Sequence, residues 1–481
     1  MHLAGSRQLL ALVPALLLVL VAQADSPGLA GTRRPGPPPN LQSGLARLDQ
    51  QMAQSQLDLP AATDQPQPLA AEDTDPLKAH EVFGFAPYWT LNVSEGFDVQ
   101  SLTTLAYFGV DIAGDGSVVK SGNGWTGYES QALAALIDRA HAGNARLVLT
   151  AKAFDQPTLD ALANDPNAAG RLAAELTDLL KAKNLDGVNL DFEGQGPADR
   201  SGIANLVTGV SKQLHATNPH WQVTVDTYAG AAGDQGGFFD IGALAPGVDA
   251  MFVMAYDMHR NGVASPNAPL PADEGAVRSY LNVAPPEKLL LGVPFYGYDW
   301  PTKSNQPNSD AAGPPQPRSY GELASAGHTV YWDPNARVPW TAYQQSAQWH
   351  EAYYDNPQSV ALKAQLVARY GLRGVGIWAL GMDGNDPRMM AAVLGSATPF
   401  SAASGPAAAA ISGGAGSPGS PGSPGSPGQP GATPSGAAGS ATPTPTSNPT
   451  PAPTSSPTPR PSPSPTPVVP PLPSPPLPPI H

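Results

Sequence analysis

Cysteine is absent from the 481 residues of this chain, and charged residues are scarce. Without cysteine the protein forms neither a disulfide nor a thiolate metal site. Only 13% of the residues are charged, and the formal net charge is −14. This balance leaves no basic stripe for nucleic-acid phosphates, so we expect no nucleic-acid partner.

Two motifs of metal and nucleotide chemistry are also missing. The nine histidines form no His-Glu-x-x-His pair, because His350-Glu351 is not followed by the second histidine. No phosphate-binding glycine loop follows any of the expected strands. We therefore predict a protein that uses no metal, no cofactor and no nucleotide.

The sequence has no apolar run long enough for a typical membrane span near its start. Residues 9–21 are apolar over about 13 positions, against the ~20 needed to cross a bilayer. Arg7 precedes this run and Ala22-Gln23-Ala24 resembles a cleavage site, so residues 1–24 are predicted to be a signal peptide. An uncleaved membrane anchor is the alternative. A secreted chain without cysteine fits a bacterium, and we expect it to be extracellular or associated with the cell wall.

Two segments of biased composition flank the centre of the chain. Residues 25–78 are rich in Pro, Gln and Ala and read as a disordered spacer, with a short helix expected around Leu45 to Leu57. Residues 399–481 form a Pro/Gly/Ser/Thr-rich tail that includes GSPGSPGSPGSPGQPG at 416–431. Such a tail favours a semi-extended stalk that associates with a cell wall, or an inert linker, and both interpretations stay open.

Residues 79–398 have the pattern of one folded domain. Eight short apolar or β-branched runs recur there, with helical patterns such as 130–142, 168–183 and 204–216 between them. This alternation predicts parallel βα units and an α/β fold, namely a (β/α)₈ TIM barrel. An open, doubly wound sheet is the structural alternative. The long gap after the seventh run predicts a small α+β insertion between strands 7 and 8. The expected strands are 82–87, 104–108, 146–151, 187–192, 222–228, 250–256, 288–296 and 374–380.

The stretch DGVNLDFEG, residues 186–194, places polar residues inside an apolar strand. Side chains alternate along a strand, so Asn189, Asp191 and Glu193 share one face and point into the barrel. This row climbs to the C-terminal rim, where barrel enzymes keep their active sites. Burying carboxyl groups without a use is costly, and like charges in proximity raise one pKa, as a general acid requires. A solvated loop with incidental acids is the alternative reading.

These residues resemble the Asp-Gly-x-Asp-x-Asp-x-Glu signature of glycoside hydrolase family 18, the chitinase-like barrels. Three further segments follow in family order: MAYD (254–257), LGVPFYGYDW (291–300) and Trp378 in GVGIWAL. The resemblance covers essentially all of residues 79–398. It implies a glycosidase that binds an N-acetylglucosamine-containing polysaccharide, chitin or peptidoglycan.

The resemblance also implies roles for individual residues. Glu193 is expected to be the general acid, and Asp191 to orient the 2-acetamido group of the substrate, whose carbonyl oxygen attacks the anomeric carbon. Tyr256 is expected to hydrogen-bond this acetamido group. Trp378 is expected to form the apolar floor under the sugar, although a plain barrel-core tryptophan is the alternative. Further residues are candidates for substrate contact: Asp257, Asn189, Asp186, Tyr296, Tyr88, Trp89 and Tyr228. For the four aromatic residues among them, core packing is equally open. His259 lies close enough in sequence to reach the site, but a lone histidine is more often a structural residue, and that interpretation is favoured.

Two positions depart from the chitinase pattern. Asn189 replaces the first acid of the Asp-x-Asp-x-Glu core, and residues 150–155 read TAKAFD in place of Ser-x-Gly-Gly. Together with PFYGYDW and YDNPQS (354–359), these departures resemble the bacterial spore-cortex-lytic N-acetylglucosaminidases, which act on peptidoglycan. That branch typically has Glu where this chain has Asp257, and its LysM wall-binding repeats are not visible here.

Three functions are compatible with the sequence. The first is a secreted, monomeric glycosidase that cleaves β-1,4 linkages next to N-acetylglucosamine. The second is a catalytically silent chitinase-like lectin, which the presence of both Asp191 and Glu193 disfavours. The third is a wall-associated structural protein whose barrel only grips glycan.

Overall fold

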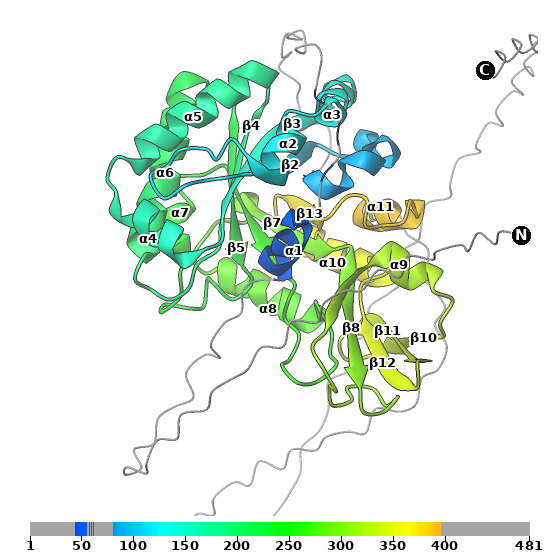
Figure 1. The fold of residues 1–481 in the computed structure, drawn as a ribbon. Helices are drawn as coiled ribbons and strands as arrows, with labels where there is room; N and C mark the ends of the chain where they lie inside the picture. The colour runs from blue at the N-terminus through cyan, green and yellow to red at the C-terminus, as the bar shows by residue number, and fades with distance from the viewer. Residues whose placement is uncertain (1–43, 55–56, 58, 60, 62–79, 396–481) are drawn as a thin grey trace, which may run out of the picture. The chain divides into compact units, whose positions relative to one another are not determined.

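The computed structural model describes residues 44–54, 57, 59, 61 and 80–395 (Figure 1). The predicted signal peptide (1–24), most of the spacer (25–78) and the tail (399–481) lie outside the described residues. Within the spacer, the helix expected around Leu45 to Leu57 is present as α1, Gly44–Ala53.

Eight parallel strands close into a barrel in the order β1-β13-β7-β6-β5-β4-β3-β2. The predicted (β/α)₈ fold is confirmed, and closure between β1 and β13, with Phe83 opposite Gly376, excludes the open sheet. Close packing inside the ring demands glycine at 376, because a Cβ there would lie 2.0 Å from the ring of Phe252. The barrel strands are β1 Glu81–Pro87, β2 Thr104–Asp111, β3 Arg146–Ala153, β4 Gly187–Phe192, β5 Gln222–Tyr228, β6 Ala250–Met254, β7 Leu289–Pro294 and β13 Gly374–Trp378.

Helices cover the outside of the barrel because their apolar residues recur with helical spacing. In α5, Leu172, Leu176, Leu179 and Leu180 form one buried stripe, and the helix ends where Asn184 adopts a φ of 52°. Figure 1 shows α5 and α6 side by side outside the strands. The helices associated with the barrel are α2 Gly122–Tyr128, α3 Gln131–Ala142, α4 Gln156–Asn164, α5 Ala168–Lys183, α6 Arg200–Thr217, α7 Ile241–Leu244, α8 Leu270–Tyr280, α10 Pro357–Tyr370 and α11 Pro387–Val393, with 3-10 helices η1 Tyr88–Gly96, η2 Val99–Ser101 and η3 Pro286–Lys288.

Along the chain, the segment between β7 and β13 forms a second, antiparallel sheet, which confirms the predicted α+β insertion. Its five strands have the order β10-β11-β12-β8-β9. The expected strand 288–296 is shorter in the structure, because β7 ends at Pro294. The chain leaves the barrel after Pro294, the Phe295 N–H bonds to Trp378 O at 2.6 Å, and Tyr296 begins the second sheet. The insertion comprises β8 Tyr296–Thr302, β9 Gln316–Ser319, α9 Tyr320–Ser325, β10 Val330–Asp333, β11 Val338–Gln345 and β12 Gln348–Tyr353.

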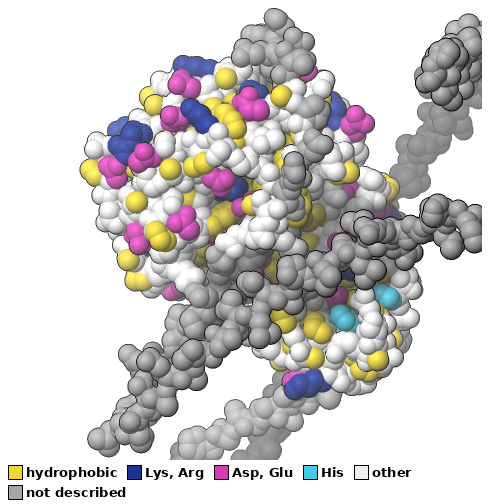
Figure 2. All heavy atoms as spheres, in the orientation of Figure 1, with side chains coloured by type: hydrophobic (Ala, Val, Ile, Leu, Met, Phe, Trp, Pro, Cys, Tyr) yellow, Lys and Arg dark blue, Asp and Glu magenta, His cyan; other side chains and the backbone are white. Residues whose placement is uncertain are grey.

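The surface view shows how charge is distributed on one face. Acidic and basic side chains are interspersed over the described part of this face rather than gathered into areas of one sign (Figure 2). None of the helices in the described ranges is long and apolar enough to cross a membrane.

Candidate active site

The polar row predicted from DGVNLDFEG lies inside the carboxyl end of the barrel. Asn189 and Asp191 are fully buried, and Glu193 is 6% exposed. The Glu193 N–H extends the ladder between β3 and β4 by donating to Ala153 O at 3.0 Å. Directly after it, a Cβ on Gly194 would lie 2.2 Å from the ring of Phe238, so close packing fixes the chain that follows the acid.

Asp191 has a cation on one neighbouring strand and a carboxyl group on the other. Lys152 of β3 is its register partner. On β5, Val225 pairs with Leu190, so Asp226 comes level with Asp191 one residue further along. Burial and then the charge of Asp226 raise the pKa of Asp191 well above its ordinary value, while Lys152 opposes the rise.

Asn189 contacts β5 and not Asp191. Its Nδ2 donates to Asp226 Oδ2 at 2.8 Å, and its Oδ1 accepts a hydrogen bond from Thr224 Oγ1 at 2.7 Å. Burial raises the pKa of Asp226 well above the ordinary range, although the bond from Asn189 opposes this and the charge of Glu193 adds to it. The sequence reading missed Asp226; its only signal was an acid at an inward position of the expected strand 222–228.

The hydroxyl of Tyr256 is placed among the carboxyl groups. It is buried, and within the described part of the chain it has no hydrogen-bond partner. Burial and the charges of four acids raise the pKa of Tyr256, so that it stays a hydroxyl donor: Asp226, Asp257, Asp191 and Glu193. Neither carboxylate oxygen of Asp191 has a partner among the described residues. Donor and acceptor are thus both open to a substrate amide.

Asp257 is held by two tyrosines of the insertion. Its carboxylate accepts hydrogen bonds from Tyr296 at 2.5 Å and Tyr298 at 2.7 Å. Its backbone has a φ of 59°, and its N–H donates to Asn267 Oδ1 at 2.8 Å. Two of the predicted contact residues, Asp257 and Tyr296, are therefore joined to each other beside Tyr256, whose ring lies 6.0 Å from that of Tyr296.

Trp378 forms part of an aromatic cluster at the end of β13. Its ring is fully buried, 4.8 Å from Phe108 and 5.2 Å from Phe85 between centroids, with Trp89 at 6.3 Å. The indole Nε1 has no hydrogen-bond partner among the described residues. Trp89 is half-buried, so it is the member of this pair that presents an aromatic surface at the same end of the barrel as the carboxyl groups.

Helix α1 contacts the carboxyl ends of the first three strands. Asp49 Oδ2 accepts from Lys152 Nζ at 2.9 Å, and Lys152 also pairs with Asp111 at the end of β2. Tyr88, just after β1, donates to the Asp49 carbonyl at 3.3 Å, so its hydroxyl is directed to the helix. Asn123 Nδ2 donates to Met52 O at 3.2 Å. The spacer therefore supplies a buried carboxylate, that of Asp49, next to the polar row of β4.

Two of the candidate residues have structural roles. Asp186 precedes β4, at the opposite end of the barrel, where it accepts from Leu147 N at 2.7 Å and contacts His141 Nε2 at 2.8 Å. The prediction of Asp186 as a substrate contact is thus wrong, because a residue before a parallel strand cannot reach the carboxyl end. Tyr228 ends β5 and donates to Gly194 O at 3.2 Å, which steadies the chain after Glu193.

His259 packs on the insertion, with its ring 4.5 Å from Tyr298 and 5.5 Å from Trp300. This contact supports its structural interpretation. In the described ranges, no group of three or more His, Cys, Asp or Glu side chains is arranged to hold a metal ion.

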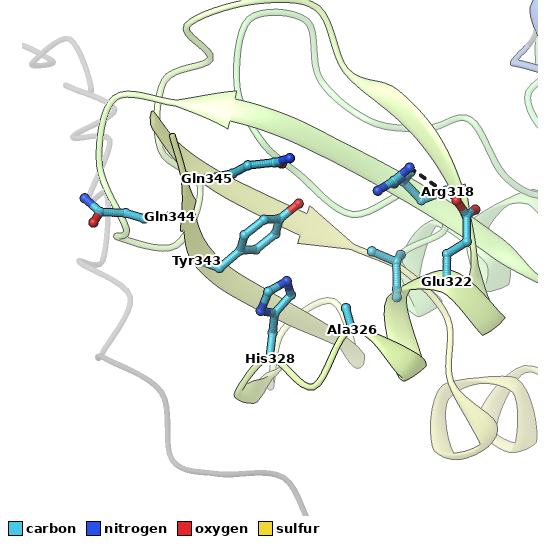
Figure 3. A pocket seen from close by; sticks show the side chains of 8 residues that line it. Arg318, Glu322, Ala326, His328, Tyr343, Gln344 and Gln345 are labelled. Carbon is cyan, nitrogen blue, oxygen red and sulfur yellow. Dashed lines mark hydrogen bonds and ion pairs between the residues drawn. The ribbon is translucent and has the colours of Figure 1, made fainter. Parts of the chain in front are cut away.

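A separate pocket opens on the insertion (Figure 3). His328 and Tyr343 stack there at 3.9 Å, and Arg318 pairs with Glu322 at 3.2 Å. These aromatic and charged groups already contact one another, and none of them belongs to the polar row of β4.

A closed parallel barrel that gathers buried carboxyl groups, a tyrosine hydroxyl and an aromatic surface at the carboxyl end of its strands is the arrangement of a barrel glycosidase. The family model of glycosyl hydrolases family 18 matches residues 82–383. The chain therefore belongs to glycosyl hydrolases family 18, and the resemblance of its motifs is confirmed.

The relatives include eukaryotic and bacterial enzymes. Human di-N-acetylchitobiase is 29% identical over 384 residues, covering 73% of this chain and 91% of the relative. The cortical fragment-lytic enzyme of Bacillus subtilis is 25% identical and covers 48% of this chain and 55% of its own length, so members of the cortex-lytic branch are among the relatives.

Solved structures share the fold. The Cycas revoluta family GH18 chitinase, in complex with allosamidin, superposes with a TM-score of 0.59 at 22% identity, covering 66% of this chain and 99% of that one. The Bacillus megaterium spore cortex-lytic enzyme gives a TM-score of 0.56 at 19% identity, covering 67% and 76%.

Proposed function

We propose that this protein hydrolyses β-1,4 linkages at N-acetylglucosamine in chitin-type or peptidoglycan glycans, and that the substrate's own acetamido group acts as nucleophile. The observation that carries the proposal is the grouping of Glu193, Asp191 and Tyr256, in which an acid, an acceptor and a donor converge in a buried site. The names of the relatives, a chitobiase and a cortical fragment-lytic enzyme, support both substrate classes.

The reaction follows from these three groups. Glu193 gives its proton to the glycosidic oxygen as the bond from C1 to this oxygen breaks. The acetamido carbonyl oxygen attacks C1 and forms a cyclic, positively charged intermediate. Asp191 accepts the acetamido N–H and its negative charge stabilises the intermediate, while the Tyr256 hydroxyl donates to the acetamido group. Water, deprotonated by Glu193, then opens the ring at C1 with net retention of configuration.

Trp378 and Trp89 are assigned to the apolar side of the sugar. Pyranose rings present a face of C–H groups, and an aromatic ring beneath them excludes water and holds the sugar in register. Asp257, fixed by Tyr296 and Tyr298, is assigned to the same sugar as a hydrogen-bond acceptor.

The proposal extends to where the protein acts, namely outside the cell and in association with the cell wall. The predicted signal peptide and the Pro-rich tail support a secreted enzyme that acts at a cell wall. The test is cell fractionation with antibody detection: an extracellular or wall-bound protein that starts after Ala24 agrees with the proposal, and a cytoplasmic protein that retains residues 1–24 contradicts it.

The function is tested with the full chain on chito-oligosaccharides and, separately, on purified peptidoglycan. Mass spectrometry of the products identifies the glycan cleaved, and proton NMR of the fresh product identifies the anomer. Cleavage with a β-anomeric product is expected. Tight binding of either glycan without cleavage would support the lectin, and an α-anomer would overturn the mechanism while leaving the activity.

A further inference from the structure

Position 189 lacks the carboxyl group that the family signature has two residues before Asp191. We propose that Asp226, from the next strand, is a positioning residue that supplies this missing carboxyl group to Asp191. This inference rests on the proposed function and adds a residue to it.

The backbone register brings the two carboxyl groups together. Leu190 pairs with Val225, so Asp191 and Asp226 are neighbours across β4 and β5, at the ~4.8 Å spacing of adjacent strands. Both are buried, with exposed fractions of 0% and 1%. Their side chains point to the same side of the sheet because residues that are level on neighbouring strands share a face.

Asn189 is suited to hold Asp226 in this place. Its amide N–H donates to Asp226 Oδ2, and its carbonyl is occupied by the Thr224 hydroxyl, which fixes the orientation of the amide. Asp226 Oδ1 is left without a partner among the described residues. One oxygen of Asp226 is thus anchored as an acceptor, and the other can carry a proton.

Two buried carboxyl groups at this distance hold one proton between them, because a second negative charge would repel the first in a poorly solvated site. The proton rests on Asp226 while Asp191 carries the charge that stabilises the cyclic cation. It returns to Asp191 when the product leaves, so no proton is exchanged with solvent and no other reactant is needed.

Lys152 determines which of the two carboxyl groups carries the charge and which keeps the proton. It lies on the Asp191 side of the row, and its positive charge favours the charged form of Asp191 over that of Asp226. The titratable groups that face Asp191 come from every neighbouring element: Lys152 from β3, Asp226 and Tyr228 from β5, Glu193 from the end of β4, Tyr256 after β6 and Asp49 from α1.

The test exchanges the amide and the carboxyl group between positions 189 and 226. The full chain is prepared as wild type, Asp226→Asn, Asn189→Asp and the double variant Asn189→Asp/Asp226→Asn. For each, kcat and KM are measured on a chito-oligosaccharide across the pH range, and thermal unfolding is followed by circular dichroism at each pH.

Asp226→Asn removes the carboxyl group that holds the shared proton, so the charged form of Asp191 loses the acidic donor beside it and is less well stabilised. We expect kcat to fall about tenfold, a typical effect of one member of a coupled polar group, with KM nearly unchanged. The acidic limb of the pH profile shifts to higher pH, because the charged form of Asp191 is no longer stabilised by a protonated neighbour. Asn189→Asp adds a third acid and shifts this limb to higher pH. The double variant recovers both the wild-type limb and most of kcat.

A merely structural Asp226 would lower the unfolding temperature of Asp226→Asn without moving the acidic limb, and that result overturns the proposal. So does a double variant no more active than Asp226→Asn. If Asp226→Asn does not fold, the limb of Asn189→Asp and the recovery in the double variant decide. A wild type that cleaves no glycan would overturn the proposed function, whereas an active wild type with an unshifted Asp226→Asn profile would overturn this inference alone.

Discussion

A few buried atoms at the end of β4 and β6 define the chemistry of this site. Asp191 offers two carboxylate oxygens and Tyr256 one hydroxyl, all without partners among the described residues. Buried polar groups are almost always hydrogen-bonded, so a cluster of unpaired ones indicates a binding site for a polar ligand. In the proposed function, the energy of leaving them unpaired is recovered when an acetamido group, itself a donor and an acceptor, enters.

Tyr256→Phe tests the donor half of this cluster. The substitution removes the hydroxyl and retains the ring that packs 6.0 Å from Tyr296. We expect kcat to fall about 100-fold, the usual effect of deleting one donor to a developing charge, with little loss of stability. Steady-state kinetics check this, with Tyr354→Phe, at a buried tyrosine directly after β12, as the control. Equal activity of the two variants would contradict the role of Tyr256.

How far the sequence predicts these residues depends on the kind of information each needs. Strand alternation was sufficient to direct Asn189, Asp191 and Glu193 inward. It could not identify Asp226, because its relation to Asp191 depends on the register between two strands that are 35 residues apart along the chain. Asp186 was misassigned because it was chosen as a member of the motif, although the expected strand 187–192 already placed it before the strand, at the opposite end of the barrel.

At the scale of elements, the sheet boundaries were the least predictable feature. The run from Leu289 to Trp300 is mostly apolar and aromatic, yet it belongs to two sheets, and the chain passes from one to the other at Phe295. Local hydrophobicity does not distinguish a strand inside a barrel from one in an adjoining sheet. The barrel strands and the main helices were predictable since their periods, two and 3.6 residues, are encoded locally.

Helix α1 is the element whose position has a direct consequence for access. It is tied to Lys152, Tyr88 and Asn123, all at or after the carboxyl ends of strands, where a glycan must lie. We therefore expect a sugar that approaches β1 to β3 to compete with α1, and the apparent affinity to fall as the fraction of molecules with a docked α1 rises.

Asp49→Ala tests this competition. The variant removes the ion pair with Lys152 and leaves Asp111 to neutralise the lysine. We expect KM for oligosaccharides to fall about twofold or more, because a weakly docked α1 is displaced more easily. Initial rates over a range of substrate concentrations check this, with the exposed Gln50→Ala on the same helix as control. A KM that rises or stays the same would show that α1 does not obstruct the substrate.

At the scale of the whole molecule, buried acids outside the site shape the pH dependence of stability. Glu351 of β12 is fully buried, and burial raises its pKa to about 8, despite a hydrogen bond from Ser309 N at 3.4 Å. Its value in the unfolded chain is near the ordinary 4.5. Between these two values the folded chain holds a proton that the unfolded chain has lost, so stability falls as the pH rises from about 4.5 to about 8.

Glu351→Gln removes this pH-dependent contribution. We expect wild type and variant to have similar free energies of unfolding at pH 5. At pH 8.5 the variant should be more stable, by up to about 4 kcal/mol. Urea unfolding at both pH values measures the difference, and the exposed Glu95→Gln serves as control. A variant that is less stable than wild type at pH 8.5 would contradict the buried, protonated state of Glu351.

The central claim is that Glu193 donates the proton that breaks the glycosidic bond, and Glu193→Gln tests it most directly. The variant and the exposed control Glu287→Gln are assayed for hydrolysis of chito-oligosaccharides and peptidoglycan, and their glycan binding is measured by calorimetry. We expect Glu193→Gln to lose at least about 100-fold in kcat and still to bind the glycan, because the amide keeps the shape of the side chain but has no acidic proton. Hydrolysis by Glu193→Gln at the rate of the Glu287→Gln control would contradict it.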